Sequence, residues 1–221
     1  MLPHRSAGND INVARGKFIS LEGGEGAGKS TQAKLLRDSL ESRGRKVLLT
    51  REPGGSPGAE EIRKLLVEGD RDRWTPLAET LLFLAARADH VARAIEPALA
   101  AGIWVISDRF ADSTFVYQGI ARGLGIETVR RLQRAVIGDF APDLTIILDL
   151  DPGAGLARAG KRGGSENRFE KFDAGFHAKL REGFLEIGRS EPRRSAVIPA
   201  SGASEDIARQ IWRLVEERLQ P

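Results

Sequence analysis

Short apolar runs alternate with longer stretches of helical periodicity along most of this chain. Residues 17–22 are largely apolar and are followed at once by glycines, as in a buried strand that enters a tight turn. Leucine and alanine then recur at helical spacing from Ser30 to Arg43, and Gly44 supplies a stop before a second apolar run at residues 46–50. The pattern predicts a strand, a helix and a strand in that order.

A segment rich in glycine and proline separates this unit from a long helix. Residues 51–58 hold two prolines and three glycines, which interrupt helix and strand alike, so a loop is expected after the second strand. Thr75 and Pro76 suit the N-cap and the first turn of a helix. Its apolar positions continue to Leu99, and Gly102 ends it.

The remaining apolar runs complete a sheet. Residues 103–106 and, apart from Thr145, residues 144–148 are apolar runs, as expected of parallel strands that are covered on both faces. Residues 196–199 are a candidate fifth strand, and residues 204–219 repeat apolar side chains at the spacing of an amphipathic helix. We therefore expect an α/β fold with an open parallel five-stranded sheet flanked by helices.

The composition is that of an ordinary globular protein. The chain has 221 residues, of which 41% are hydrophobic and 29% charged, and no apolar run approaches the roughly 20 residues that span a membrane. This length favours a single domain at residues 16–221, and residues 1–15 are interpreted as a flexible leader because they hold no apolar segment. We expect a soluble, cytoplasmic protein that is not bound to a membrane.

Charge and metal-ligating residues exclude further classes. The chain has no cysteine, which rules out disulfides and thiolate metal sites, and its three histidines are too far apart in sequence to suggest a zinc cluster. A net charge of +3 does not indicate a nucleic-acid-binding protein. Small molecules are therefore the expected partners.

One segment carries a specific chemical signature. Residues 23–30 fit G-x-x-x-x-G-K-[ST] between a predicted strand and a predicted helix. In that setting backbone N–H groups surround phosphate oxygens, Lys29 reaches the β- and γ-phosphates of ATP, and the Ser30 hydroxyl is offered to Mg²⁺. The predicted ATP-binding residues are Gly23, Gly24, Glu25, Gly26, Ala27, Gly28, Lys29, Ser30 and Thr31.

The rest of the chain favours a kinase over other P-loop proteins. A guanine-reading Asn-Lys-x-Asp motif is absent. The loop after the second strand carries charged residues, and residues 158–170 are rich in charge and glycine. We interpret the latter as a lid that closes over phosphates and excludes water, with a solvated charge run as the alternative.

Four segments in order resemble the thymidylate kinase family. They are residues 21–30, 50–55, 82–90 and 108–119, and the resemblance extends over nearly all of residues 16–220. It implies a P-loop nucleoside-monophosphate-kinase fold with a short lid at about residues 158–170. It also implies ATP and thymidine monophosphate as substrates, Mg²⁺ as cofactor, a role in dTTP biosynthesis and a homodimer.

The resemblance implies a pocket for the acceptor nucleoside. Phe83 would stack on thymine, and Arg87, one helical turn further on, would hydrogen-bond the base. Pattern alone favours a core position for Phe83 and a solvated helix face for Arg87. Tyr117 would pack under the deoxyribose, and Thr114 or Gln118 would meet the thymine edge, with a core tyrosine and a surface amide as alternatives.

Charged residues in the same segments are implied to hold phosphates. Asp108 and Arg109 follow a strand at the carboxyl edge of the sheet, where open α/β folds bind ligands. Arg109 would grip the acceptor phosphate, Asp108 would organise Mg²⁺ together with Ser30, and Arg51 would be a second phosphate ligand. The implied acceptor-binding residues are Glu25, Arg51, Pro53, Phe83, Arg87, Arg109, Ser113, Thr114, Tyr117 and Gln118.

Glu25 is unusual because a carboxylate in a phosphate-binding loop repels phosphate unless it faces away. A Glu25 side chain that points away from the ATP phosphates faces the acceptor. The resemblance implies that it accepts a hydrogen bond from the sugar 3′-hydroxyl of that acceptor. The alternative is an ion pair with a nearby arginine.

Catalysis is expected to rest on positioning and charge neutralisation, because an acceptor phosphate is already anionic and needs no general base. Residues 24–27 of the P-loop contain no arginine. We therefore expect the lid to supply an arginine finger in cis. The predicted catalytic residues are Lys29, Asp108, Arg109 and the lid candidates Arg158, Arg162 and Arg168.

Two other functions fit the sequence. A kinase of the same fold that acts on another small acceptor would differ at the base-facing residues Phe83, Arg87 and Tyr117. A P-loop module that switches partners with its nucleotide state would need no acceptor pocket at all.

Overall fold

The computed structural model describes residues 14–160 and 167–221. Most of the predicted leader at residues 1–15 lies outside the described residues, as does the centre of the predicted lid with Arg162.

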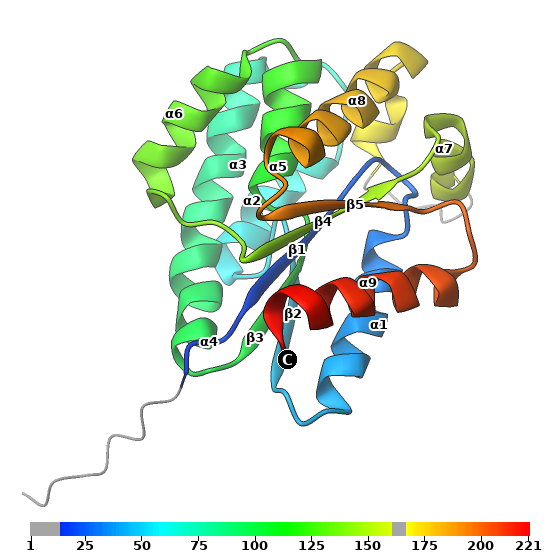
Figure 1. Cartoon of the computed structure of the whole chain (residues 1–221). Coiled ribbons are helices and arrows are strands. Elements are labelled where there is room, and N and C mark those ends of the chain that lie inside the picture. The colour runs from blue at the N-terminus through cyan, green and yellow to red at the C-terminus, as the bar shows by residue number, and fades with distance from the viewer. Residues whose placement is uncertain (1–13, 161–166) are drawn as a thin grey trace, which may run out of the picture.

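Five parallel strands form one sheet in the order β2-β3-β1-β4-β5 (Figure 1). Leu21 in β1 pairs with Asp108 in β3, so the segments that follow these two strands leave the sheet side by side. The predicted five-stranded parallel sheet is confirmed. The strands are β1 (Phe18–Glu22), β2 (Val47–Arg51), β3 (Trp104–Asp108), β4 (Leu144–Asp149) and β5 (Ser195–Pro199).

Helices cover both faces of the sheet (Figure 1). Helices α1 (Lys29–Glu41) and α9 (Ser204–Leu219) lie together on one face, while α3 (Pro76–His90), α6 (Ile126–Ile137) and α8 (Ala174–Ser190) lie on the other. The other helical segments are α2 (Pro57–Val67), the π-helical η1 (Val91–Ile95), α4 (Glu96–Ala100), α5 (Ala111–Thr114), the π-helical η2 (Phe115–Ala121), α7 (Pro152–Gly160) and the 3₁₀-helical η3 (Arg168–Lys171).

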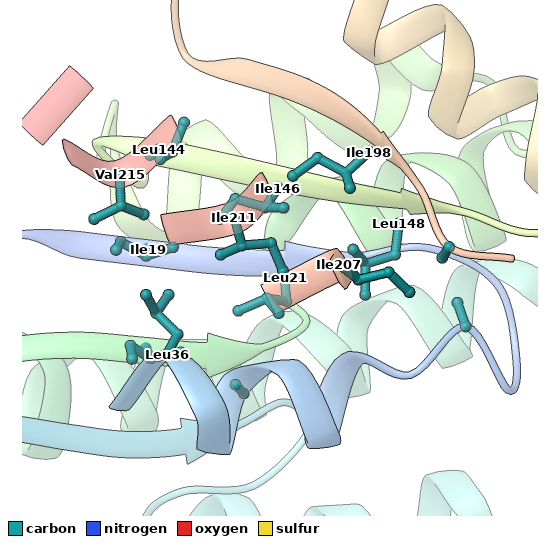
Figure 2. Packing of buried hydrophobic residues seen from close by; sticks show 14 of the residues in the cluster. Ile19, Leu21, Leu36, Leu144, Ile146, Leu148, Ile198, Ile207, Ile211 and Val215 are labelled. Atoms are coloured by element: carbon teal, nitrogen blue, oxygen red, sulfur yellow. The ribbon is translucent and has the colours of Figure 1, made fainter. Parts of the chain in front are cut away.

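The apolar side chains of the strands contribute to two hydrophobic cores, one on each face of the sheet, because successive side chains point to opposite faces. Ile19 and Leu21 of β1 join the core beneath α1 and α9, whereas Phe18 joins the core beneath α8 and η2. Figure 2 shows the first of these cores, in which Leu36 of α1 and Ile211 of α9 meet strand residues. The rigid sheet thereby fixes where its carboxyl edge presents loops.

Two expectations about the second strand and the long helix have different outcomes. The loop predicted at residues 51–58 ends early, because Ser56 is an N-cap and Pro57 fits the first turn of α2. The helix predicted from Thr75 is confirmed, and the Ala78 N–H donates to Thr75 Oγ1 at 3.3 Å. It continues through η1 and α4, with a π-helical turn along its length.

Among the helices that the structure describes, none has both the length and the apolar character needed to cross a membrane.

Candidate active site

The P-loop connects β1 to α1 and packs tightly against α7. Gly26 has φ +66°, and a Cβ atom on it would lie 1.9 Å from the carbonyl oxygen of Gly155 in α7. The same contact appears from the other side, since a Cβ on Gly155 would lie 2.3 Å from the carbonyl oxygen of Glu25. Glycine is therefore required at both positions for this approach of backbone to backbone.

Lys29 begins α1 and turns back over the P-loop. Its Nζ donates to the carbonyl oxygens of Gly24 at 2.7 Å and Gly23 at 3.1 Å. Burial lowers the pKa of Lys29 to about 8, with Arg109 acting in the same direction and Glu25 against it. The ammonium group is thus held where a phosphate can displace its contacts with the loop carbonyls.

The structure brings together Ser30 and Asp108, the two residues predicted to bind Mg²⁺. The Ser30 hydroxyl donates to Asp108 Oδ2, which joins the first turn of α1 to the end of β3. Within the described part of the chain, no group of three or more His, Cys, Asp or Glu residues is arranged to hold a metal ion by itself. A hydroxyl and one carboxylate fit Mg²⁺ that arrives with a nucleotide, because Mg²⁺ takes most of its ligands from phosphates and water.

Arg109 occupies a left-handed backbone conformation, with φ +72°. Its N–H donates to the Leu21 carbonyl at 2.9 Å, and its carbonyl accepts from Ser107 Oγ at 2.7 Å, so the turn is held on both sides. The guanidinium reaches across to the P-loop, where it donates to the Gly23 carbonyl at 3.0 Å and to Ser113 Oγ at 3.1 Å.

Glu25 lies opposite this guanidinium. Its Oε1 accepts from Arg109 Nη2 at 2.9 Å and from the Tyr117 hydroxyl at 2.7 Å. Burial alone would raise the pKa of Glu25, but Arg109, Lys29 and the Tyr117 hydrogen bond lower it to about 2. The ion pair considered from the sequence is therefore present, and the contact with a sugar hydroxyl remains a prediction.

Glu22 is a functional candidate that sequence reasoning missed. This carboxylate is fully buried, accepts from the Phe110 N–H at 2.7 Å and accepts from Ser113 Oγ at 2.6 Å. Burial and the neighbouring Asp112 raise its pKa to about 7. Glu22 thus braces the turn on which Arg109 sits, and the available signal was a carboxylate at the end of an otherwise buried strand.

A cleft of about 730 Å³ runs from the P-loop to α3 and η2. Gly23 and Gly24 lie outside its lining, on a smaller cavity behind the P-loop. The predicted residues that line it are Glu25, Gly26, Ala27, Gly28, Lys29, Ser30, Thr31, Arg51, Pro53, Phe83, Arg87, Asp108, Arg109, Ser113, Thr114, Tyr117, Gln118 and Arg158.

Arg87 is not on a solvated helix face. Its guanidinium is buried and donates to Glu52 at 2.8 Å, to Gln133 at 2.8 Å and to Thr114 at 2.9 Å. The solvated alternative for Arg87 is therefore wrong. Phe83 is half-buried at the cleft, so it does not belong to the core as the pattern alone favoured.

The three lid arginines have different positions. Arg158 lines the cleft and donates to the Ala200 carbonyl at 3.3 Å, while Arg162 lies outside the described residues. Arg168 is fully buried and does not line the cleft. Its neighbour Phe169 does, with its ring edge-on to Tyr117 at a centroid distance of 5.4 Å.

Comparison with known proteins decides the family. The family model described as thymidylate kinase matches residues 21–211. A thymidylate kinase from Magnetococcus marinus is 50% identical over 205 residues, which are 93% of this chain and 98% of that protein. Another from a Jannaschia species is 54% identical over 202 residues, which are 91% of this chain and 97% of that protein.

This chain belongs to the thymidylate kinase family. The crystal structure of thymidylate kinase from Ehrlichia chaffeensis superposes with a TM-score of 0.74 at 32% identity, covering 91% of this chain and 99% of that one. As a member of the thymidylate kinase family, the protein is a nucleoside monophosphate kinase. The interpretation as a nucleotide-dependent switch module without an acceptor is therefore wrong.

Proposed function

We propose that this enzyme transfers the terminal phosphoryl group of ATP to thymidine monophosphate, which yields ADP and thymidine diphosphate for dTTP synthesis. One observation carries the proposal beyond family membership. A single cleft holds the P-loop cation Lys29 at one end and the Phe83 ring and the Arg87 guanidinium at the other. Phosphates and a planar base are thus accommodated in one continuous space.

The reaction follows from the charges in this cleft. An anionic oxygen of the acceptor phosphate attacks the γ-phosphorus, the bond from that phosphorus to the β–γ bridging oxygen breaks, and ADP leaves with the electron pair. Lys29 and Arg109 hold the two phosphates in reach of each other. Ser30 and Asp108 would hold Mg²⁺, which would further neutralise the phosphate charge.

The ion pair with Glu25 positions Arg109 beside the P-loop. The ion pair at 2.9 Å leaves the guanidinium facing the Gly23 carbonyl and Ser113, beside the P-loop. Because Glu25 and the Tyr117 hydroxyl are joined at 2.7 Å, the carboxylate also lies next to the residue assigned to the deoxyribose. This arrangement supports the proposed contact of Glu25 with the sugar 3′-hydroxyl.

Arg158 is the best-supported arginine finger among the lid residues. It lines the same cleft as Lys29 and Ser30, the P-loop residues proposed to bind the phosphates of ATP and Mg²⁺. Among the described residues its guanidinium makes one hydrogen bond, the long contact with the Ala200 carbonyl, which a phosphate oxygen can replace.

We further propose that the enzyme is a cytoplasmic homodimer. The location rests on its substrates, which are nucleotides of the cellular pool. The dimer is supported by Leu77 and Leu81, large apolar side chains that are 46% and 48% exposed on α3. Val136 on α6, which packs against α3, is 42% exposed as well.

A substrate panel tests the reaction. ADP release and diphosphate product are followed with ATP, Mg²⁺ and each of several nucleoside monophosphates, with a control that lacks an acceptor. We expect the highest kcat/KM with thymidine monophosphate. A clear preference for another monophosphate would overturn the assignment of the base pocket while leaving the phosphate site intact.

A further inference from the structure

A buried cluster of charge lies where α3 begins, beside the acceptor end of the cleft. Glu79 in the first turn of α3 is fully buried and forms an ion pair with Arg168, which lies near the end of the predicted lid segment. Arg122 lies 3.7 Å from Glu79 Oε1. Gln118 Nε2 donates to the same oxygen at 2.9 Å.

Arg168 is fixed by far more than this ion pair. Its guanidinium donates to the carbonyl oxygens of Asp70 at 2.9 Å, Leu66 at 3.1 Å and Arg71 at 2.7 Å, all at or after the end of α2. A planar guanidinium that donates to three backbone carbonyls and pairs with a buried carboxylate has one orientation. Arg168 therefore holds the Glu79 carboxylate in place.

The position of Glu79 determines which way the Gln118 amide faces. A carboxylate paired with arginines accepts hydrogen bonds and donates none, so the amide nitrogen of Gln118 must face Glu79. Gln118 also lines the cleft together with Phe83 and Arg87. The Gln118 amide therefore presents its oxygen to a ligand in the cleft, with its second N–H beside that oxygen.

We propose that Glu79, anchored by Arg168, is a positioning residue that fixes the polarity of the Gln118 amide and thereby selects the acceptor base. The proposal rests on the proposed function, in which Gln118 meets the base edge. An oxygen in fixed orientation accepts from the ring N–H of a thymine or uracil edge. Cytosine presents a ring acceptor at that position, so the two would repel.

Glu79→Gln tests this directly. Glutamine is of the same size and either donates or accepts, so the Gln118 amide becomes free to turn over. We expect the ratio of kcat/KM for thymidine monophosphate over deoxycytidine monophosphate to fall about tenfold or more. Turnover at saturating thymidine monophosphate should stay within about threefold of the wild type.

Glu61→Gln is the matched control, because Glu61 is exposed on α2 and bonds only Lys64 among the described residues. A lower melting temperature of Glu79→Gln with an unchanged ratio would show a merely structural role and overturn the inference. Failure of the proposed function is distinguishable from failure of this inference, because in that case the wild type itself shows no preference for thymidine monophosphate.

A measurement on the wild-type protein covers the case in which Glu79→Gln does not fold. The side-chain NH₂ signal of Gln118, identified in ¹H–¹⁵N spectra by its loss in Gln118→Met, is followed during titration with thymidine monophosphate. We expect one amide proton to be protected from exchange before and after binding, because it stays bonded to Glu79. Loss of that protection on binding would refute the inference.

Discussion

At the scale of single residues, the chemistry depends on buried charges that face one another across the P-loop. Glu25 stays ionised because Arg109 and Lys29 outweigh the cost of burial, whereas Glu22 is driven towards its neutral form by burial and Asp112. Two carboxylates three positions apart thus have opposite roles. One meets the cation of the site, and the other braces the turn beneath it.

Glu22 makes a specific contribution to the pH dependence of stability. Its pKa of about 7 in the folded protein exceeds the ordinary value of 4.5, so the folded state binds more protons between these two pH values. Its contribution to the free energy of unfolding therefore falls as the pH rises through this window. Glu22→Gln mimics the neutral acid and should remove that part of the fall.

Melting temperatures measured from pH 5 to pH 8 check this expectation. The wild type should lose roughly 3 °C or more relative to Glu22→Gln over that range. Parallel profiles for the two proteins would show that Glu22 does not titrate there.

The two described lid arginines should respond differently to alanine. Arg158→Ala should lower kcat about 10³-fold with little change in melting temperature, because Arg158 lies at the cleft and holds one backbone carbonyl. Arg168→Ala should lower the free energy of unfolding by about 3–5 kcal/mol, because it leaves the buried Glu79 carboxylate and three backbone carbonyls without their partner.

Denaturant unfolding and steady-state kinetics on both variants separate these effects. Normal turnover in Arg158→Ala would contradict its role as the finger and turn attention to Arg162.

At the scale of secondary-structure elements, the P-loop depends on a helix far away in the sequence. Helix α7 approaches so closely that Gly26 and Gly155 meet backbone to backbone. The P-loop glycines were predicted from the motif, but Gly155 was not, because its requirement arises from a neighbour that sequence spacing does not reveal. The helical periodicities of α1, α3 and α9 were by contrast readable, since each buries one face.

Gly155→Ala should disturb ATP binding although it lies outside the motif. The new Cβ would lie 2.3 Å from the Glu25 carbonyl, so the P-loop must shift. We expect the KM for ATP to rise about tenfold or more. Gly160→Ala in the same helix meets no atom of the described residues within 4 Å and should leave the KM unchanged, and equal effects of the two would refute the explanation.

At the scale of the whole molecule, the sheet gathers site residues from most of the chain. Arg51 ends β2, Arg87 lies in α3, Arg109 follows β3 and Arg158 lies in α7, yet all four line one cleft at the carboxyl edge. The opposite surface of α3 carries apolar residues that the monomer leaves open. A second copy of the chain is the occupant that we propose for it.

The association state tests this surface. Leu81→Glu places a charge where Leu81 is 48% exposed and should convert a dimer of about 48 kDa, twice the 24.1 kDa chain, into a monomer. Light scattering after size exclusion measures the mass. Val197→Glu on the edge strand β5 is the control, and a monomeric wild type would contradict the proposed dimer.

The sequence by itself determined the sheet, the P-loop and the family, because these depend on local periodicity and on contiguous residues whose backbone forms the phosphate site. The tertiary structure decided which distant charges meet. Glu25 and Arg109 lie 84 positions apart, and Gln118 and Glu79 lie 39 apart, so their contacts depend on strand register and helix packing. Packing likewise buried Arg168 against backbone carbonyls and left Arg158 at the cleft. The sequence does not reveal this difference, because both arginines lie in one charged segment.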